Sequence, residues 1–554
     1  MHTGAQLFVE ALQRLGIDRI FTLVGDHLNE VLAEAARAGV DIIHMRHESG
    51  VTHAADAYAR ITRRPAIAVV TGGPGHTNSL TGIATAYLAC SPLIAVSGSR
   101  ANSVADRQGF QDIDQLGMTR PVVKWAAQPF SAAQIPFYLA RAYAEATAAR
   151  MGPVHLTIPV DIFSAFVSES PVMPPITPAQ LPPASETEIG AALDLIRTAE
   201  RPIVIAGSGV WWSDAGTELK QFIEHMSLPL YTITMARGVV PDDHPLCLGY
   251  ADPALNRAAH RAFQDADLFL ILGKRIDFRL GFGGPRVLAK DAKCIQVDIH
   301  PQEFGMNRAI DLAILADVKK ALEQLLKAAA APEPRTAWLK HLHALHEDWR
   351  QAIRKAAFDT GHPMHPAAFY AELREHLPRE TLFSWDGGDF THWGRAGIPA
   401  LHAGGWLRLG PLAAIGSALP NGIALKLAHP DQPVAVITGD GALGFYIAEL
   451  ETAVRYKLPL IIIVGNDSGW GLERELQRAQ MDHTVACELS STRYDIVMKG
   501  FGGDGESVES LDQIPAALQR ALRSSVPYLL NVIVRGVRSP FTEWTLAGKQ
   551  KRAS

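Results

Sequence analysis

Two short runs of glycine and carboxylate-bearing residues could together hold a metal ion and an anion. Gly439-Asp440-Gly441-Ala442 follows the apolar run 434–438, and Gly465-Asn466-Asp467-Ser468-Gly469-Trp470 follows the apolar run 460–464. Asp440 and Asp467 offer hard oxygen atoms, and Mg²⁺ usually takes only a few of its roughly six oxygens from protein and the rest from phosphate and water. Glycines allow backbone N–H groups to approach an anion closely. The two runs therefore predict half of a site for a metal-bound diphosphate.

The elements expected around these runs would bring the two carboxylates together. Each apolar run predicts a buried parallel strand. Residues 447–456, between the runs, have the spacing of an amphipathic helix. Two parallel strands joined by a helix place Asp440 and Asp467 at the same edge of a sheet, which is where open α/β sheets bind their ligands.

A second group of residues, near the start of the chain, has weaker signals when each is taken alone. Glu48 follows His47 and precedes a helical pattern, which by itself favours a solvated residue at a helix start. The loop 72–75, Gly-Gly-Pro-Gly, follows the apolar run 66–71. Such a loop predicts either a plain tight turn or a close approach of the backbone to a ligand. Gln111 carries no signal of its own.

Short apolar runs alternate with amphipathic stretches along the chain, a pattern typical of α/β domains with parallel sheets. The expected strands are 20–24, 66–71, 93–97, 154–158, 203–206, 268–272, 295–299, 381–385, 434–438, 460–464 and 528–534. Linkers are expected at 170–183 and 328–334, and a connecting helix at 341–357. We predict three doubly wound parallel-sheet domains at 1–168, 186–330 and 365–538, followed by a tail at 539–554 that could act as a lid.

Composition excludes several classes of protein. The 554 residues are 47% hydrophobic and 20% charged, as expected for a globular chain with several cores. The net charge of −5 is too mild to indicate nucleic acid or a membrane surface as a partner, and no apolar run reaches the ~18 residues of a membrane span. Four cysteines without CxxC spacing favour reduced thiols. The start of the chain lacks the pattern of a signal peptide, so we expect a cytoplasmic protein.

Taken in order, these segments resemble the thiamine diphosphate-dependent enzymes, in the branch of acetolactate synthases, oxalyl-CoA decarboxylases and 2-hydroxyacyl-CoA lyases. The likeness covers nearly the whole chain. It rests on Gly439-Asp440-Gly441 with Asp467 placed 27 residues after Asp440, on His47-Glu48, on Gly73-Pro74-Gly75 and on the segment 410–416. The family usually has two asparagines where this chain has Asn466-Asp467. That departure and the segment 385–390 are most similar to the second type of 2-hydroxyacyl-CoA lyase.

The resemblance implies roles for individual residues. Mg²⁺ would be held by Asp440, Asp467 and the carbonyl of Gly469. Glu48 would be the catalytic residue, binding the pyrimidine ring of the cofactor in apolar surroundings and favouring its imino tautomer. Ile415 would bend the cofactor, although a core position would equally explain an isoleucine there. The remaining cofactor-binding residues would be Gly75, Asn78, Gly387, Gly388, Asp389, Ala413, Gly439, Gly441 and Ala442, with Asp467 shared between metal and cofactor.

Further residues would serve the substrate. The resemblance places Gln111, Trp470 and Glu473 on the substrate side. In the second unit, Lys274, Arg275 and Asp298 lie at expected strand ends and could contact phosphates and a ribose. This unit would then bind ADP or the nucleotide of CoA, with FAD less favoured, or it would be purely structural. The tail would close over a CoA arm, or it would be disordered.

The reaction implied by the resemblance is that of a 2-hydroxyacyl-CoA lyase. Such an enzyme cleaves the C1–C2 bond of a 2-hydroxyacyl-CoA to formyl-CoA and an aldehyde or ketone, and it also runs the reverse condensation. The alternatives are an acetolactate synthase-like carboligase or decarboxylase acting on 2-keto acids, a non-catalytic cofactor-binding protein and a flavin-dependent oxidase. Active sites of the family lie between the first unit of one subunit and the third unit of its partner, which implies a homodimer or homotetramer.

Overall fold

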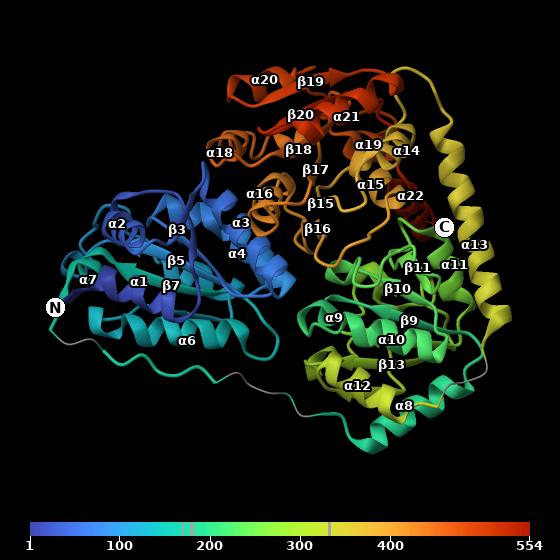
Figure 1. Cartoon of the computed structure of the whole chain (residues 1–554), viewed down its shortest axis with the longest axis horizontal. Helices are drawn as coiled ribbons and strands as arrows, with labels where there is room; N and C mark the ends of the chain where they lie inside the picture. The colour runs from blue at the N-terminus through green and yellow to red at the C-terminus, as the bar shows by residue number, and fades with distance from the viewer. Residues whose placement is uncertain (169–170, 178–180, 182, 331–333, 554) are drawn as a thin grey trace.

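The computed structural model describes residues 1–168, 171–177, 181, 183–330 and 334–553, and the side chains of 549–553 lie outside that description. Parts of both expected linkers, 170–183 and 328–334, therefore fall outside the described residues. The described chain forms three α/β domains and a C-terminal helix (Figure 1). Each domain contains one six-stranded sheet in which all neighbouring strands are parallel, as the sequence predicts.

The first domain contains the sheet with the strand order β3-β2-β4-β5-β7-β6. Its strands are β2 (Arg19–Thr22), β3 (Asp41–His44), β4 (Ala66–Val70), β5 (Leu93–Ser99), β6 (Trp125–Ala127) and β7 (Val154–Pro159). The four strands expected from the sequence are present, with ends within two residues of those expected. Two further strands, β1 (His2–Thr3) and β8 (Phe166–Val167), pair antiparallel outside this sheet.

The third domain repeats this arrangement. Its sheet has the order β16-β15-β17-β18-β20-β19, so both sheets read 2-1-3-4-6-5 when strands are counted within their own domain. The strands are β15 (Leu382–Trp385), β16 (Trp406–Arg408), β17 (Val434–Gly439), β18 (Leu460–Asn466), β19 (Asp504–Val508) and β20 (Tyr528–Ile533). The sequence pattern did not establish this shared topology.

The central domain has a different order, β11-β10-β9-β12-β13-β14. Its strands are β9 (Pro202–Ala206), β10 (Leu230–Thr232), β11 (Cys247–Tyr250), β12 (Leu268–Leu272), β13 (Lys293–Asp298) and β14 (Leu312–Leu315). In all three sheets both edge strands were missed from the sequence. Edge strands such as β3, β6 and β14 are largely half-exposed or exposed, so they carry no continuous apolar run.

Helices cover both faces of the sheets. Those of the first domain are α1 (Gly4–Arg14), α2 (Asn29–Arg37), α3 (Glu48–Thr62), α4 (Pro74–Ala89), α5 (Gln115–Thr119), α6 (Ile135–Thr147) and α7 (Val160–Ser164). Those of the central domain are α8 (Glu186–Thr198), α9 (Ser208–Trp212), α10 (Gly216–Met226), α11 (Arg257–Asp265) and α12 (Val318–Ala328). Those of the third domain are α14 (Pro366–His376), α15 (Asp389–Gly397), α16 (Ala418–Ala428), α17 (Asp440–Leu443), α18 (Glu449–Arg455), α19 (Gly471–Met481), α20 (Tyr494–Gly500) and α21 (Ile514–Arg523).

Helices make three of the contacts between domains. The expected connecting helix is α13 (Thr336–Ala357), which runs beside the central and third domains on the right of Figure 1. The last helix, α22 (Pro540–Ala553), lies between those two domains. Helix α3 packs against α16, so Val51 and Ala55 share one apolar core with Leu419 and Ile423. Among the described residues, no helix has the length and apolar character needed to cross a membrane.

Candidate active site

The two carboxylates singled out from the sequence meet at one edge of the third sheet. Strands β17 and β18 are parallel neighbours with Gly439 opposite Gly465, so Asp440 and Asp467 leave the sheet at the same edge. Asp440 is only 3% exposed. Its Oδ1 accepts a hydrogen bond from the backbone N–H of Gly441 at 2.9 Å, and its Oδ2 accepts one from Gly469 at 3.0 Å.

Electrostatics favour a cation beside this pair. Burial raises the pKa of Asp440 to about 6. Burial, followed by repulsion from Asp440, raises the pKa of Asp467 to about 7. Each shift reflects a carboxylate that is costly to ionise where it stands. The hard oxygens of these carboxylates and of the Gly469 carbonyl are the ligand types that suit Mg²⁺, so the residues present fit that ion.

Arg474 is a residue of this site that the sequence analysis missed. It is buried on α19, and its Nη2 pairs with the Asp467 carboxylate while its Nη1 lies 3.1 Å from Glu488 Oε2. A side chain at Gly469 would come within 2.7 Å of Arg474 Nη1, so the guanidinium lies against the backbone of the predicted metal loop. Arg474 therefore offsets the charge that an aspartate adds at position 467.

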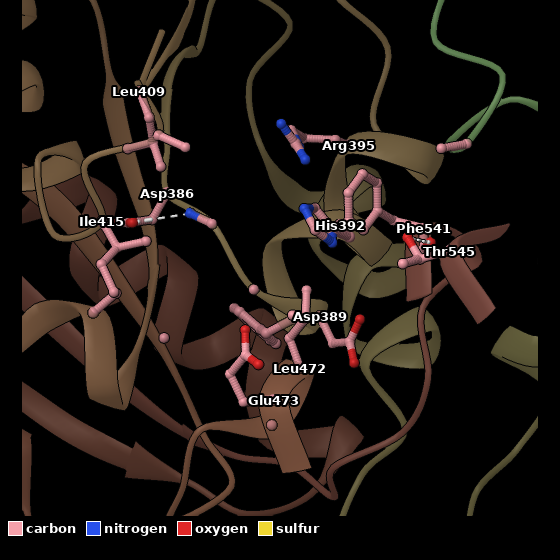
Figure 2. A pocket seen from close by; sticks show the side chains of 18 of the residues that line it. Asp386, Asp389, His392, Arg395, Leu409, Ile415, Leu472, Glu473, Phe541 and Thr545 are labelled. Carbon is pink, nitrogen blue, oxygen red and sulfur yellow. Dashed lines mark hydrogen bonds between the residues drawn. The ribbon is translucent and has the colours of Figure 1, made fainter. Parts of the chain in front are cut away.

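The loops after β15 and β16 form the opposite wall. A Cβ at Gly387 would lie 3.2 Å from Ile415 Cγ2. Ile415 is only partly buried and lines a cavity, so it does not occupy a plain core position. Ala413 adopts φ +57°, a left-handed conformation that a residue with a Cβ seldom takes and that marks local strain. The buried Asp386 carboxylate accepts the Gly416 N–H at 2.9 Å and holds this loop against β15. Figure 2 shows Asp386 close to Ile415.

Asp389, expected beside the diphosphate, has a different set of partners. Its Oδ1 accepts hydrogen bonds from the hydroxyls of Ser539 and Thr542, the latter at 2.6 Å, and from the Ser539 backbone. Phe541 packs on the ring of His392 with 4.3 Å between centroids. The carboxylate of Asp389 thus anchors the start of α22, and the predicted tail is an ordered helix through residue 553.

A cavity of about 760 Å³ connects these elements. Its walls include loops of the third domain, α22, and residues 252–254 and 278–287 of the central domain. Trp470 and Glu473, expected on the substrate side, also line it, and Figure 2 shows Glu473 beside Leu472 at the end opposite Arg395. The predicted residues that share this cavity are Gly387, Gly388, Asp389, Ala413, Ile415, Gly439, Asp440, Gly441, Ala442, Asp467, Gly469, Trp470 and Glu473.

The remaining predicted residues form a separate cluster in the first domain. Glu48 begins α3 and is 9% exposed, so a solvated residue at a helix start is the wrong interpretation. Asn78 Nδ2 donates to Glu48 Oε2 at 3.0 Å. A Cβ at Gly75 would lie 3.4 Å from Glu48 Oε1, and one at Gly73 would come within 2.7 Å of Gln111 Cβ. The backbone of the glycine loop therefore closely approaches both glutamate and glutamine.

One chain does not bring the two clusters into a common cavity. The described walls of the 760 Å³ cavity contain no residue of the first domain. The domains do touch elsewhere, where Glu449 of α18 accepts the Arg46 N–H at 3.1 Å beside Gly50. Glu48 and Asp440 therefore stand on two half-sites of the same chain.

The central domain contains a second cavity, of about 590 Å³, lined by Lys274, Arg275 and Asp298. Lys274 Nζ forms an ion pair with Asp277 at 2.7 Å, and Arg275 donates to the Leu88 carbonyl at 2.6 Å. Burial raises the pKa of Asp298 to about 6. The cations expected to bind phosphate thus already have protein partners. The two cavities share wall residues, namely Phe278, Arg279, Arg408, Gly410 and Pro411.

Comparison with known proteins identifies the class that this fold and these glycine–carboxylate loops define. The profile described as "Thiamine pyrophosphate enzyme, N-terminal TPP binding domain" matches residues 2–118, the profile for the central domain matches 189–325, and that for the C-terminal TPP binding domain matches 386–532. The chain therefore belongs to the thiamine pyrophosphate enzyme family. It is a thiamine diphosphate-dependent enzyme, which confirms the resemblance and removes the non-catalytic alternative.

The chain is similar to enzymes of two kinds. The chain is 35% identical to the "Probable acetolactate synthase" of Mycobacterium bovis, with 96% of both chains covered. It is 30% identical to "2-hydroxyacyl-CoA lyase 1" of Homo sapiens, with 96% of this chain and 94% of the relative covered. It is 29% identical to "2-hydroxyacyl-CoA lyase 2" of Danio rerio, over 96% and 91%. These sequence identities alone do not distinguish the reaction of an acetolactate synthase from that of a 2-hydroxyacyl-CoA lyase.

Proposed function

We propose that the enzyme is a 2-hydroxyacyl-CoA lyase that cleaves the C1–C2 bond of its substrate to formyl-CoA and an aldehyde or ketone. The observation that carries this proposal is the extent of the cavity beyond the metal loop. At about 760 Å³ it is within the range of about 300–1,000 Å³ that holds large ligands. It also shares a wall with the central cavity of about 590 Å³. A CoA thioester is long enough to use both, whereas a small 2-keto acid needs neither.

The cofactor would be thiamine diphosphate with Mg²⁺. When bound, thiamine diphosphate supplies a nucleophilic carbon and an electron sink for breaking a bond beside a carbonyl. Asp440, Asp467 and the Gly469 carbonyl would hold the metal, and the N–H groups of Gly441 and Ala442 would face the diphosphate. Glu48, half enclosed by Asn78, would hold and release the proton of the pyrimidine ring.

A second copy of the chain would complete the site. The Glu48 and Asp440 half-sites lie apart within one chain, and each is bordered by exposed apolar side chains. Phe110, beside Gln111, is 79% exposed, and Phe445, three residues after Ala442, is 57% exposed. Apolar groups beside half-sites suit a docking surface for a partner. We therefore propose a homodimer, or a homotetramer built from it, in which each half-site faces the complementary one.

The central cavity would hold a nucleotide. Strand ends of a doubly wound sheet suit that role. Since Lys274 and Arg275 already bind Asp277 and a backbone carbonyl, an ADP group would have to share or displace these contacts. ADP or the nucleotide of CoA is proposed before FAD.

The second candidate function is an acetolactate synthase-like carboligase acting on 2-keto acids. Two observations favour it. One is the 35% identity to the mycobacterial protein named as a probable acetolactate synthase. The other is a set of arginine side chains in the cavity wall, of which Arg395 is buried, and such groups can bind a small carboxylate.

The two functions are separated by product analysis. The purified enzyme with thiamine diphosphate and Mg²⁺ is incubated with lactoyl-CoA, with 2-hydroxyisobutyryl-CoA and with pyruvate. The lyase produces formyl-CoA and acetaldehyde or acetone from the thioesters, detected by mass spectrometry. The Asp440→Asn variant serves as the cofactor-deficient control. Carbon dioxide from pyruvate without formyl-CoA from either thioester rejects the lyase in favour of the carboligase.

A further inference from the structure

A buried arginine without a counter-ion lies in the wall of the main cavity. Arg395, on α15, is 3% exposed. Its Nε is buried without a hydrogen-bond partner, and no carboxylate of the described chain pairs with its guanidinium. Figure 2 shows this guanidinium beside the cavity, above the ring of His392. Burying an unpaired charge costs several kcal/mol, so such an arrangement indicates a missing partner.

Two further arginines are close to Arg395. Arg408 donates from Nη1 to the Tyr250 hydroxyl, but its Nε is buried without a partner. Arg279 Nη1 pairs with Asp252 at 2.8 Å. Three guanidinium groups thus share one carboxylate. Burial lowers the pKa of both Arg395 and Arg408, and for Arg408 the neighbouring charges of Arg279 and Arg395 add to the effect.

The cluster faces the cavity that contains the metal loop. All three arginines act electrostatically on His392, whose pKa is held well below its usual value by burial and by these charges. His392 lines the main cavity, as do Arg279, Arg395 and Arg408. Arg395 also borders a hollow on its other side, where Arg237 and Arg379 are paired with Asp242 and Asp243 and Arg374 is exposed. Arg279 and Arg408 line the main cavity and not that hollow, so the three guanidinium groups come together at the main cavity.

We propose that Arg395, Arg408 and Arg279 form a binding subsite for an anionic oxygen-bearing group of the substrate, either a phosphate or a carboxylate. Guanidinium groups bind both in bidentate fashion, and the buried setting strengthens such bonds. Arg395 is the specificity-determining member, because Arg279 already has Asp252 and Arg408 has Tyr250. The subsite rests on the proposed function only for the identity of the anion, which is a phosphate of CoA for a lyase and the carboxylate of a 2-keto acid for a carboligase.

The first test separates a ligand-binding role from a structural one. Arg395→Met keeps most of the side-chain volume and removes the charge. In the holoenzyme without substrate we expect its melting temperature to equal or exceed that of the parent, because an uncompensated buried charge is gone. A side chain that mainly supports the fold would give a lower melting temperature when removed. Arg395→Lys, which keeps the charge but not the planar fork, is expected to melt like the parent.

The second test identifies the anion by calorimetric titration of the holoenzyme with CoA, pantetheine and pyruvate. We expect Arg395→Met to weaken binding of the anionic probe about ten- to a hundredfold, the usual loss for a charged hydrogen bond. If the variant binds CoA more weakly but binds pantetheine like the parent, the subsite binds a phosphate. If it binds pyruvate more weakly, the subsite binds a carboxylate. The control is Arg523→Gln, at an exposed arginine at the end of α21 outside both hollows, which should change binding of none of the three probes.

Two results would overturn the subsite: unchanged binding of both CoA and pyruvate in Arg395→Met, or a variant that melts well below the parent while Arg395→Lys restores stability but not binding. Failure of the lyase proposal looks different. In that case neither thioester yields formyl-CoA, while pyruvate binding still depends on Arg395. Conversely, the enzyme could produce formyl-CoA while Arg395→Met binds both CoA and pyruvate like the parent. That result supports the lyase proposal and rejects the subsite.

Discussion

The first and third domains have the same strand order but contain chemically different halves of the site. In each, the third strand leads into a glycine-rich loop at a helix start, β4 into α4 and β17 into α17. The first loop contains no carboxylate and lies against Glu48 and Gln111, whereas the second contains Asp440. The shared topology determines the edge of each sheet at which a ligand binds. The side chains at that edge determine which part of the ligand is bound there.

The two halves also differ in how their charges are balanced. Glu48 stands alone and accepts a hydrogen bond from the neutral amide of Asn78. Asp440 and Asp467 form an acidic pair whose charge, among the residues that the structure describes, is offset by Arg474. Under the proposed function, the first half would handle one proton, and the second would hold a cation with its diphosphate. Four substitutions test this contrast, from the largest expected effect to the smallest.

Glu48→Gln should reduce turnover most. The amide keeps the shape and the contact with Asn78 but cannot accept or release the proton, so kcat should fall about 10²- to 10⁴-fold. Thiamine diphosphate affinity, measured by tryptophan fluorescence, should change little by comparison. Glu323→Gln, at an exposed glutamate of α12, is the matched control. A variant at position 48 as active as the parent would remove the assigned role.

Asp440→Asn should affect the binding of Mg²⁺ rather than the proton transfer assigned to Glu48. Loss of one charged ligand should weaken Mg²⁺ affinity by at least about tenfold, and excess Mg²⁺ should recover part of the activity. Titration of Mg²⁺ at saturating thiamine diphosphate measures the effect. If the variant loses activity with unchanged Mg²⁺ affinity, Asp440 is not a metal ligand.

Arg474→Gln should weaken cofactor binding about tenfold, because Asp467 would lose its counter-ion. Asp467→Asn removes the same negative charge, so the double variant should bind the cofactor better than Arg474→Gln alone. The cycle is measured from the diphosphate and Mg²⁺ dependence of fluorescence. Additive effects of the two changes would show that the pair has no special coupling.

Glu449→Gln should alter pH dependence rather than activity. Burial raises the pKa of Glu449 from 4.5 to about 7, where α18 meets the first domain. The folded state therefore holds this proton more tightly than the unfolded state. Stability from this group is full below pH 4.5 and is lost as pH rises through about 7, by up to about 3 kcal/mol.

The measurement for Glu449 is the free energy of unfolding of the parent and the variant between pH 5 and 8. The glutamine resembles the protonated acid, so the variant should match the parent at pH 5 and exceed it at pH 8. Glu323→Gln should show no such divergence. Parallel stability curves for Glu449→Gln and the parent would exclude a raised pKa at this contact.

Much of the third domain's half-site followed from local sequence. Continuous apolar runs predicted β17 and β18, and parallel pairing then placed Asp440 and Asp467 at one edge. The edge strands were missed, because half-exposed strands lack such runs. Arg474 was missed as well, since an arginine on an amphipathic helix such as α19 usually faces solvent.

The sequence by itself determined the family, the cofactor and the α/β class, because glycine and carboxylate spacing at strand ends is a local property. Only the tertiary structure decided that Glu48 is buried, that Asp389 anchors α22 and that Arg395 lies unpaired in the cavity wall. Burial and pairing depend on residues far apart in the chain, such as Asp389 and Thr542. No local pattern encodes whether a charged side chain meets a partner, water or a ligand.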